Sequence, residues 1–447
     1  MDINFLFIIG SSTTIFVEGT KEGGDMLEIK RPNRSSWPER KWPRVAFIAH
    51  ALLDGYLSTD LIGRRLDEIG RNWPKDQENP GVINWFSFPA VPPDGLGQPV
   101  WVDFYIIPVI ALPEQKGKAS LNFLDACADG RAYKWAEQVA ISAIMEAKSD
   151  GVHLTVGWGA LTKVATRHGE KFLEENPWVK TYADVSTTHG DAGTAALVLE
   201  TIRRAGFQKG FHVAVIGANG AIGDVVARAL PDLNPESIML VGKEGESSGR
   251  RLQELRARVF GGSRVEVHQN KSIACHEHRS DLVIVATTGM DLVPSEIPSG
   301  ALVLDMTTPA ACSEHHDWKK NRMVLTSGCG QFADQVLPES FGSFGGKILT
   351  DVGAGGHHVL WGCTGETIAR AIYGWHGHCV GSKIPLTELE WCDAHFQALR
   401  IAPQPPVSFW DPLNWSDVHA FVERVHAKTS VQVPQLAFAF AGNTKPS

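Results

Sequence analysis

The sequence predicts an α/β protein in which an N-terminal α/β domain precedes a Rossmann-type domain with a doubly wound parallel sheet, while C-terminal helices return to the interdomain cleft. Three observations support this prediction. At 447 residues the chain is too long for one ordinary hydrophobic core, so two domains are expected. Short apolar segments alternate with amphipathic segments in its second half. A glycine-rich turn follows the first of those apolar segments.

The N-terminal domain is expected over residues 41–205, after a disordered leader of residues 1–40. The apolar stretch 5–17 in that leader is interrupted by Gly10 and a Ser/Thr run, and no basic segment precedes it. It is therefore neither a convincing signal peptide nor long enough to span a bilayer. Apolar and amphipathic periodicity predicts the elements of the domain. The expected strands are 45–50, 83–88, 100–109 and 152–156, and the expected helices are 133–148, 161–171 and 194–204.

The second domain is expected over residues 206–345. Its apolar segments are short, and helical segments or loops lie between them, which is typical of a parallel sheet with right-handed crossovers. The expected strands are 213–216, 238–241, 265–268, 282–286, 302–305 and 323–326.

A Gly-x-x-Gly-x-x-Gly turn lies between the strand 213–216 and a predicted helix, 224–230. Glycines at this spacing permit a tight turn and a close approach of the backbone to a pyrophosphate at the helix N-terminus. The alternative is a glycine turn that serves packing alone. We expect the loop to bind a dinucleotide through Gly217, Ala218, Asn219, Gly220, Ala221, Ile222 and Gly223.

The end of the second strand of this domain indicates which dinucleotide binds. Folds specific for NAD usually place an acidic residue there for the ribose hydroxyls, and this chain has Lys243 instead. Lys243, with Arg250 or Arg251 behind it, can meet a 2′-phosphate, which favours NADPH over NADH. The alternative is that these charges form the solvated start of a helix that also carries Glu246.

The C-terminal segment, residues 346–447, is expected to be helical and to carry a reactive cysteine. Helices are predicted at 363–373, 388–399 and 415–428. Cys363 opens the first of them, where the helix dipole and unpaired N–H groups favour a nucleophilic thiolate near neutral pH. The alternative is a small, buried, apolar cysteine.

Composition excludes several classes of function. A net charge of −8 argues against nucleic-acid binding. The seven cysteines are unpaired in pattern and odd in number, which favours reduced thiols in a cytoplasmic protein. Cysteine and histidine cluster at 275–278, 312–316, 357–358 and 376–379 without a repeated Cys-x-x-Cys spacing, so no metal site is predicted.

The order of these features resembles that of the long-chain acyl-acyl-carrier-protein reductase family, whose members form aldehydes. The resemblance covers residues 45–402 and includes the motifs 47–50, 104–114 and 157–162. The nucleotide loop is similar to the family's Gly-Ala-Thr-Gly-Asp-Ile-Gly, and residues 363–366 match its Cys-Phe-Ala-Glu. The Gly-Trp-His of residues 374–376 follows at the family's spacing. Asp191 and Gly193 depart from the family, which has Asn and His there.

This resemblance implies that Cys363 takes the acyl group from a thioester of acyl carrier protein or coenzyme A, and that NADPH then reduces it to an aldehyde. Backbone N–H groups of residues 362–365 are expected to stabilise the oxyanion. Glu366 is expected either to orient the site or to occupy an N3 capping position, and His376 or His189 to supply a proton. An aldehyde-consuming enzyme is a further expected partner.

Two other classes of function remain open at this stage. One is an NAD(P)-dependent dehydrogenase of a small acid or amino acid, in which Cys363 is merely packed. The other is an NADP-sensing regulatory or scaffold protein, which needs the glycine loop but not the thiol.

Overall fold

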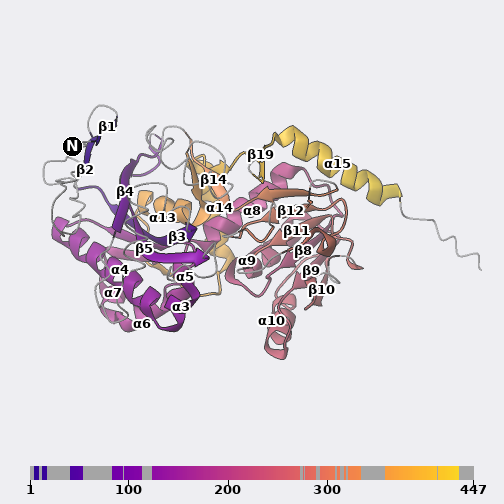
Figure 1. Cartoon of the computed structure of the whole chain (residues 1–447), viewed down its shortest axis with the longest axis horizontal. Coiled ribbons are helices and arrows are strands. Elements are labelled where there is room, and N and C mark those ends of the chain that lie inside the picture. Colours follow the sequence, from indigo (N-terminus) through magenta and orange to yellow (C-terminus); the bar gives the residue numbers. More distant parts are fainter. Residues whose placement is uncertain are drawn as a thin grey trace, which may run out of the picture.

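The computed structural model describes residues 5–9, 13–17, 41–53, 83–93, 95–112, 123–271, 275, 277–287, 292–307, 310–312, 317–318, 321–333, 358–409 and 411–431. Two sheet-containing lobes lie side by side, and long α8 runs between them (Figure 1). No helix in these ranges is both long enough and apolar enough to cross a bilayer.

The first lobe is built on a mixed six-stranded sheet of order β16-β7-β6-β3-β5-β4. Only β4 runs antiparallel to its neighbour. The strands are β3 (Arg44–Leu53), β4 (Ile83–Ala90), β5 (Val100–Leu112), β6 (Leu154–Trp158), β7 (Val185–Thr188) and β16 (His378–Cys379). The expected strands of this domain are therefore present, and β7 and β16 join them.

Alternation along β3 divides the hydrophobic core between the two faces of this sheet. Ala46 and Ile48 pack with α4 (Arg131–Asp150), whereas Val45 and Phe47 belong to the cluster that contains α13 (Gly362–Ile372). Successive side chains of a strand point to opposite faces, so both faces of β3 are covered by helices. α13 thus returns from the C-terminal part of the chain and packs against α8 and the first lobe, in line with the predicted return of C-terminal helices to the interdomain cleft.

The helix expected at 161–171 is broken in two. α5 (Thr162–Ala165) ends before Arg167 and His168, whose φ angles are 51° and 54°, and α6 (Glu170–Glu175) follows Gly169. Consecutive residues in the left-handed region cannot continue a right-handed helix. The break turns the His168 side chain towards the N-terminus of α8 (Asp191–Ala205).

The second lobe contains an all-parallel sheet of order β10-β9-β8-β11-β12-β13. Its strands are β8 (His212–Ile216), β9 (Ser237–Val241), β10 (Arg264–His268), β11 (Leu282–Val285), β12 (Leu302–Asp305) and β13 (Met323–Thr326), and its helices include α9 (Ala221–Ala229) and α10 (Glu246–Arg256). This is the doubly wound Rossmann order, which confirms the predicted fold class. Ligands of such sheets bind where the order reverses, here between β8 and β11.

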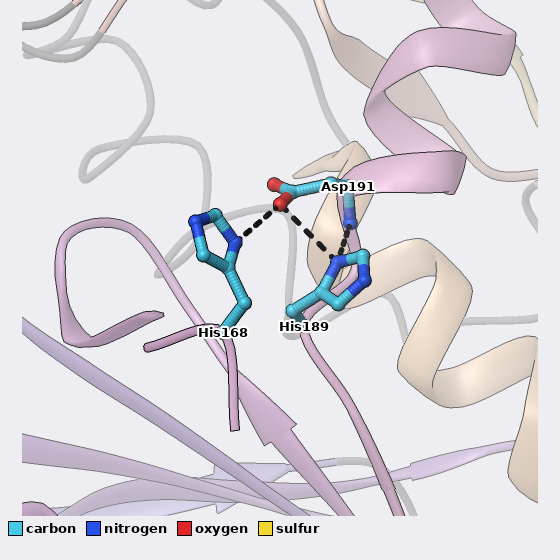
Figure 2. Close-up of side chains that lie close together, drawn as sticks. All are labelled: His168, His189 and Asp191. Carbon is cyan, nitrogen blue, oxygen red and sulfur yellow. Dashed lines mark hydrogen bonds and ion pairs between the residues drawn. The ribbon is translucent and has the colours of Figure 1, made fainter. Parts of the chain in front are cut away.

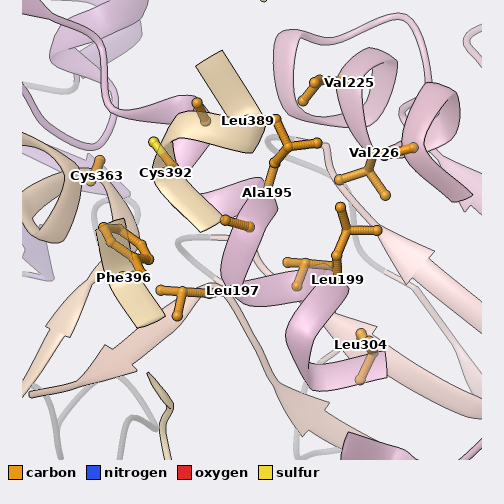
Figure 3. Packing of buried hydrophobic residues seen from close by; sticks show 14 of the residues in the cluster. Ala195, Leu197, Leu199, Val225, Val226, Leu304, Cys363, Leu389, Cys392 and Phe396 are labelled. Carbon is orange, nitrogen blue, oxygen red and sulfur yellow. The ribbon is translucent and has the colours of Figure 1, made fainter. Parts of the chain in front are cut away.

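Helix α8 joins the two lobes through one continuous core. Leu199 lies near Val225, Val226 and Leu304 of the second lobe, while Leu197 lies near Phe396 and the C-terminal helices (Figure 3). α14 (Leu386–Ala398) and α15 (Trp415–Val431) also contact α8. The smaller elements are α3 (Phe123–Ala128), α7 (Pro177–Thr181), the 3₁₀ helices Leu230–Leu233 and Pro294–Glu296, and the strands β14 (Cys329–Gln331), β15 (Val359–Trp361), β17 (Ala402–Pro403), β18 (Val407–Ser408) and β19 (Asp411–Pro412).

Within the segment expected to be a disordered leader, β1 (Phe5–Ile9) pairs antiparallel with β2 (Thr13–Val17). Aromatic and β-branched residues dominate both strands and favour this conformation. The remainder of residues 1–40 lies outside the described residues, as do residues 334–357 ahead of α13.

Candidate active site

One cavity of about 400 Å³ contains both of the features that the sequence singles out. It lies at the reversal of strand order, where the second lobe faces the first. The second lobe contributes Gly217, Asn219, Gly220, Ala221, Ile222, Lys243, Ser248, Arg251, Thr287 and Met306 to its lining. Facing them are Phe47, His50, Phe104, Ile106, Ala160, Lys163, His168, Asp191, Cys329, Trp361 and Cys363.

The glycine loop follows β8 directly and leads into α9, as predicted. Gly217 has φ of 84°, and a Cβ there would lie 2.3 Å from the carbonyl oxygen of Ala286. A Cβ at Gly223 would lie 2.3 Å from the carbonyl oxygen of Gly217. Both positions therefore require glycine. Ala218 and Gly223, which we expected to bind the cofactor, shape the turn from outside the cavity lining.

Cationic groups and a closely packed glycine, Gly242, follow the end of β9. Asn219 Nδ2 donates to Ser248 Oγ at 2.8 Å, and a Cβ on Gly242 would lie 2.7 Å from that nitrogen. Lys243 and Arg251 line the cavity. Arg250, the other candidate, instead pairs with Glu246 at 3.5 Å on an exposed helix face.

Cys363 is the second residue of α13, and its side chain lies where α13 meets α8. The approach is close because glycines stand at the start of α8. A Cβ on Gly190, the residue before α8, would lie 2.4 Å from Cys363 Cβ, and one on Gly193 would lie 2.5 Å from the Gly362 carbonyl oxygen. Gly190 also has φ of 72°. The thiol is 6 % exposed and faces the cavity.

The electrostatic environment of Cys363 differs from the sequence expectation. Burial raises the pKa of the Cys363 thiol, although the Lys163 ammonium favours the thiolate. Backbone N–H groups of Ala160 and Thr364 also favour the thiolate. Ala160 adopts the left-handed conformation, with φ of 47°, on the turn between β6 and α5. Desolvation outweighs these groups, so the pKa of Cys363 is raised above its ordinary value, whereas the helix start predicted a lowered one.

Glu366 is fully buried and lies outside the cavity lining. It accepts hydrogen bonds from Thr188 Oγ1 at 2.6 Å and Gly193 N at 2.8 Å, and it pairs with Arg370 Nε at 2.8 Å. Burial raises the pKa of Glu366, but the Arg370 guanidinium lowers it by more. The net pKa is below its ordinary value, so the group is a carboxylate. Because α13 begins at Gly362, Glu366 is not at N3 and caps nothing. It positions α13 against α8 and β7.

His376 is exposed and is not brought to Cys363. Its Nδ1 lies 3.2 Å from the Ala183 carbonyl oxygen, and its ring meets His153 edge-on at 4.6 Å. The physical reason is the helix between them, because the 11 residues of α13 separate its ends by about 16 Å. His189 is buried outside the lining, with Nδ1 accepting the Asp191 N–H at 3.0 Å and Nε2 lying 3.7 Å from Cys379 Sγ.

Sequence reasoning missed a charged group beside Cys363. Lys163 Nζ forms an ion pair with Asp191 Oδ1. His168 Nδ1 lies 3.0 Å from Asp191 Oδ2, and His189 Nδ1 lies 3.2 Å from the same oxygen (Figure 2). Lys163 was hidden within a segment expected to be one amphipathic helix. Asp191 gave the one available signal, as a departure from the family pattern.

The charge states in this cluster follow from the contacts. Burial raises the pKa of Asp191, but the Lys163 ammonium holds it well below its ordinary value. Burial lowers the pKa of Lys163, and Asp191 more than reverses this. The site therefore holds a buried ammonium and a buried carboxylate next to the thiol.

The donor atoms of His168, His189 and Asp191 lie within 4.8 Å of one another, as in a metal site. Two of these donors are already engaged, because Asp191 binds Lys163 and His189 Nδ1 accepts a backbone N–H.

No protein-family model and no curated protein matches the sequence. Similar solved structures include the NAD⁺ complex of iminosuccinate reductase from Paracoccus denitrificans, with 14 % identity over 49 % of this chain and 68 % of that one, and a TM-score of 0.25. Glutamyl-tRNA reductase from Methanopyrus kandleri is 16 % identical, over 66 % of this chain and 56 % of that one, with a TM-score of 0.24. Quinate dehydrogenase from Corynebacterium glutamicum in complex with NAD is 11 % identical, over 86 % of this chain and 99 % of that one, with a TM-score of 0.28. These similarities are too weak to assign a family.

Proposed function

We propose that this protein is a nicotinamide-dependent oxidoreductase that uses NADPH to reduce an acyl thioester to an aldehyde through a covalent thioester on Cys363. The observation that carries the proposal is that Cys363 and the dinucleotide loop line the same cavity. A nucleophile and a hydride donor must both reach one carbonyl carbon for this reaction, and a shared cavity supplies that proximity.

The cofactor half of the proposal rests on the second lobe. The N-terminus of α9 and the glycine loop suit the pyrophosphate. Lys243 and Arg251 suit a 2′-phosphate, and no acidic residue that would bind the ribose hydroxyls stands at Gly242 or Lys243. When bound, NADPH supplies the hydride that reduces the acyl carbon.

The acyl half rests on the wall opposite the loop. Phe47 and Phe104 have ring centroids 4.9 Å apart, and Phe104 and Trp361 have centroids 6.2 Å apart. Together with Ile106 these side chains form an apolar wall near Cys363. Such a wall suits the hydrocarbon part of an acyl group carried by acyl carrier protein or coenzyme A.

The protein's own groups account for the first chemical step. Cys363 Sγ attacks the thioester carbon, the bond from that carbon to the carrier sulfur breaks, and the Cys363 proton leaves with the carrier thiol. Backbone N–H groups at the start of α13 and in the turn at Ala160 are suitable donors for the developing oxyanion.

Intact mass spectrometry tests this function. Wild-type protein mixed with an acyl-coenzyme A, or with an acyl-acyl-carrier-protein, in the absence of NADPH is expected to gain the mass of one acyl group. The Cys363→Ala variant is expected to gain none. Cys329→Ala is the matched control, because Cys329 lines the same cavity on β14. Burial raises the pKa of its thiol to about 12, whereas the Lys163 ammonium opposes the effect of burial at Cys363. An adduct that persists in Cys363→Ala, or no adduct with short and long acyl chains, would contradict the proposal.

A second candidate function is hydride transfer between NADP(H) and a small free carbonyl or alcohol substrate. The Lys163–Asp191 pair favours it, because an ammonium in a cavity can polarise a carbonyl without help from a thiol. Turnover that survives in Cys363→Ala would support this candidate instead.

A further inference from the structure

Lys163 pairs with the Asp191 carboxylate and lines the same cavity as the Cys363 thiol. Its side chain is 16 % exposed, and that of Asp191 is 1 % exposed. A lysine that is buried to this extent needs a compensating charge, and the carboxylate of Asp191 supplies it. The pair lines the cavity together with Cys363, so the charge is available to a bound substrate.

The surrounding charged groups come from several elements. α8 contributes Asp191, and α13 contributes Cys363 and Glu366, both of which interact electrostatically with Lys163. His168 and His189 reach Lys163 only through Asp191, whose second oxygen they contact. His50 lines the same cavity from β3 and accepts the Leu161 N–H on Nε2 at 3.0 Å. Among these neighbours, Lys163 is the cation that acts directly on the thiol.

We propose that Lys163 stabilises the Cys363 thiolate during acyl transfer and then donates a proton to the same sulfur when the aldehyde leaves. This inference rests on the proposed function and adds a catalytic residue to it. Hydride addition to the acyl carbon of the Cys363 thioester converts its carbonyl to an oxyanion. The carbonyl then re-forms, the carbon–sulfur bond breaks, and Sγ takes a proton from Lys163 Nζ.

Lys163 regains its proton from water that enters the cavity. The sum of the second half-reaction is acyl-Cys363, NADPH and one proton giving aldehyde, free Cys363 thiol and NADP⁺. Asp191 holds the ammonium in place throughout, and His168 supports the carboxylate from the cavity side.

The thiolate role is tested without any acyl substrate, through the pH dependence of Cys363 alkylation by iodoacetamide. Lys163→Met removes the charge, and we expect alkylation at pH 8 to be about 10-fold or more slower than in wild type. Lys171→Met is the matched control, because Lys171 pairs with Glu175 at 3.8 Å on the surface of α6. NADPH binding verifies that each variant is folded.

The proton-donor role is tested with Lys163→Arg, which keeps the charge but releases its proton far less readily. This variant is expected to alkylate within a few-fold of wild type, yet to discharge a preformed acyl-enzyme about 10-fold or more slowly when NADPH is added. It also provides the test if Lys163→Met does not fold.

The outcomes separate the two proposals. Unchanged alkylation in Lys163→Met, or wild-type discharge in Lys163→Arg, would overturn the role of Lys163 while leaving the thioester mechanism intact. Failure of wild type to form an acyl adduct would overturn the thioester mechanism. The difference in alkylation rate between wild type and Lys163→Met would still decide whether Lys163 stabilises the thiolate.

Discussion

The Glu366–Arg370 ion pair is predicted to hold α13, and with it Cys363, in position. Both side chains are fully buried. Removing one partner of a buried pair costs about 3–5 kcal/mol, because the other charge is left without compensation. Glu366→Gln leaves Arg370 with Glu388 as a second carboxylate, and the amide oxygen can still accept the Gly193 N–H. We therefore expect a loss at the lower end, about 3 kcal/mol in the free energy of unfolding.

Urea unfolding followed by tryptophan fluorescence measures this loss, since the Arg370 guanidinium lies 4.0 Å from the Trp375 ring centroid and 4.8 Å from that of Trp391. Glu246→Gln is the matched control: Glu246 and Arg250 form an i,i+4 pair like Glu366 and Arg370, but on the exposed surface of α10. A change within about 0.5 kcal/mol is expected there. Equal effects of the two substitutions would refute the reasoning that burial sets the cost.

Three further predictions follow from the same contacts. The folded-state pKa of Glu366 is lowered, so its contribution to stability is present above its unfolded pKa of about 4.3 and is lost as pH falls through the folded value. In acid unfolding, the difference in stability between wild type and Glu366→Gln should therefore narrow below about pH 4 and not widen. Gly193→Ala should lower stability by about 1–3 kcal/mol in thermal unfolding, because its Cβ would lie 2.5 Å from the Gly362 carbonyl oxygen, whereas Gly365→Ala, whose Cβ would lie 3.4 Å from Phe396 Cζ, should be tolerated. Arg251→Ser should weaken NADPH binding by about 10- to 100-fold in a fluorescence titration and leave NADH binding unchanged. Arg250→Ser is the control, because Arg250 pairs with Glu246 on an exposed helix face. Equal losses of affinity for the two cofactors would place the 2′-phosphate elsewhere.

Local features could be predicted from the sequence, and features set by tertiary contact could not. The second lobe was predictable because each strand is a short apolar run, and because the glycine loop needs only its own spacing. The position of Cys363 at the start of a helix was predictable because a helix start is a local signal. Lys163, His168 and Asp191 were not, since they come from a short helix, an irregular turn and α8, and the fold alone brings them together.

His376 shows the opposite failure of sequence reasoning. The family's Gly-Trp-His spacing after Glu366 suggested that His376 shares a site with Cys363. However, α13 lies between the two residues and separates them. The sequence singled out Glu366, but its partners Thr188, Gly193 and Arg370 could not be predicted. Only the packing of α13 against α8 and β7 places them around its carboxylate.

The central claim is that an acyl group on Cys363 lies within reach of the hydride of a cofactor bound at the glycine loop. The most direct measurement isolates the acylated protein, adds NADPH that carries deuterium at the transferred position of the nicotinamide, and analyses both protein and product by mass spectrometry. We predict loss of the acyl mass from the protein and an aldehyde with one deuterium on its carbonyl carbon. An acyl-enzyme that persists in the presence of bound NADPH, or an aldehyde without deuterium, would contradict the account.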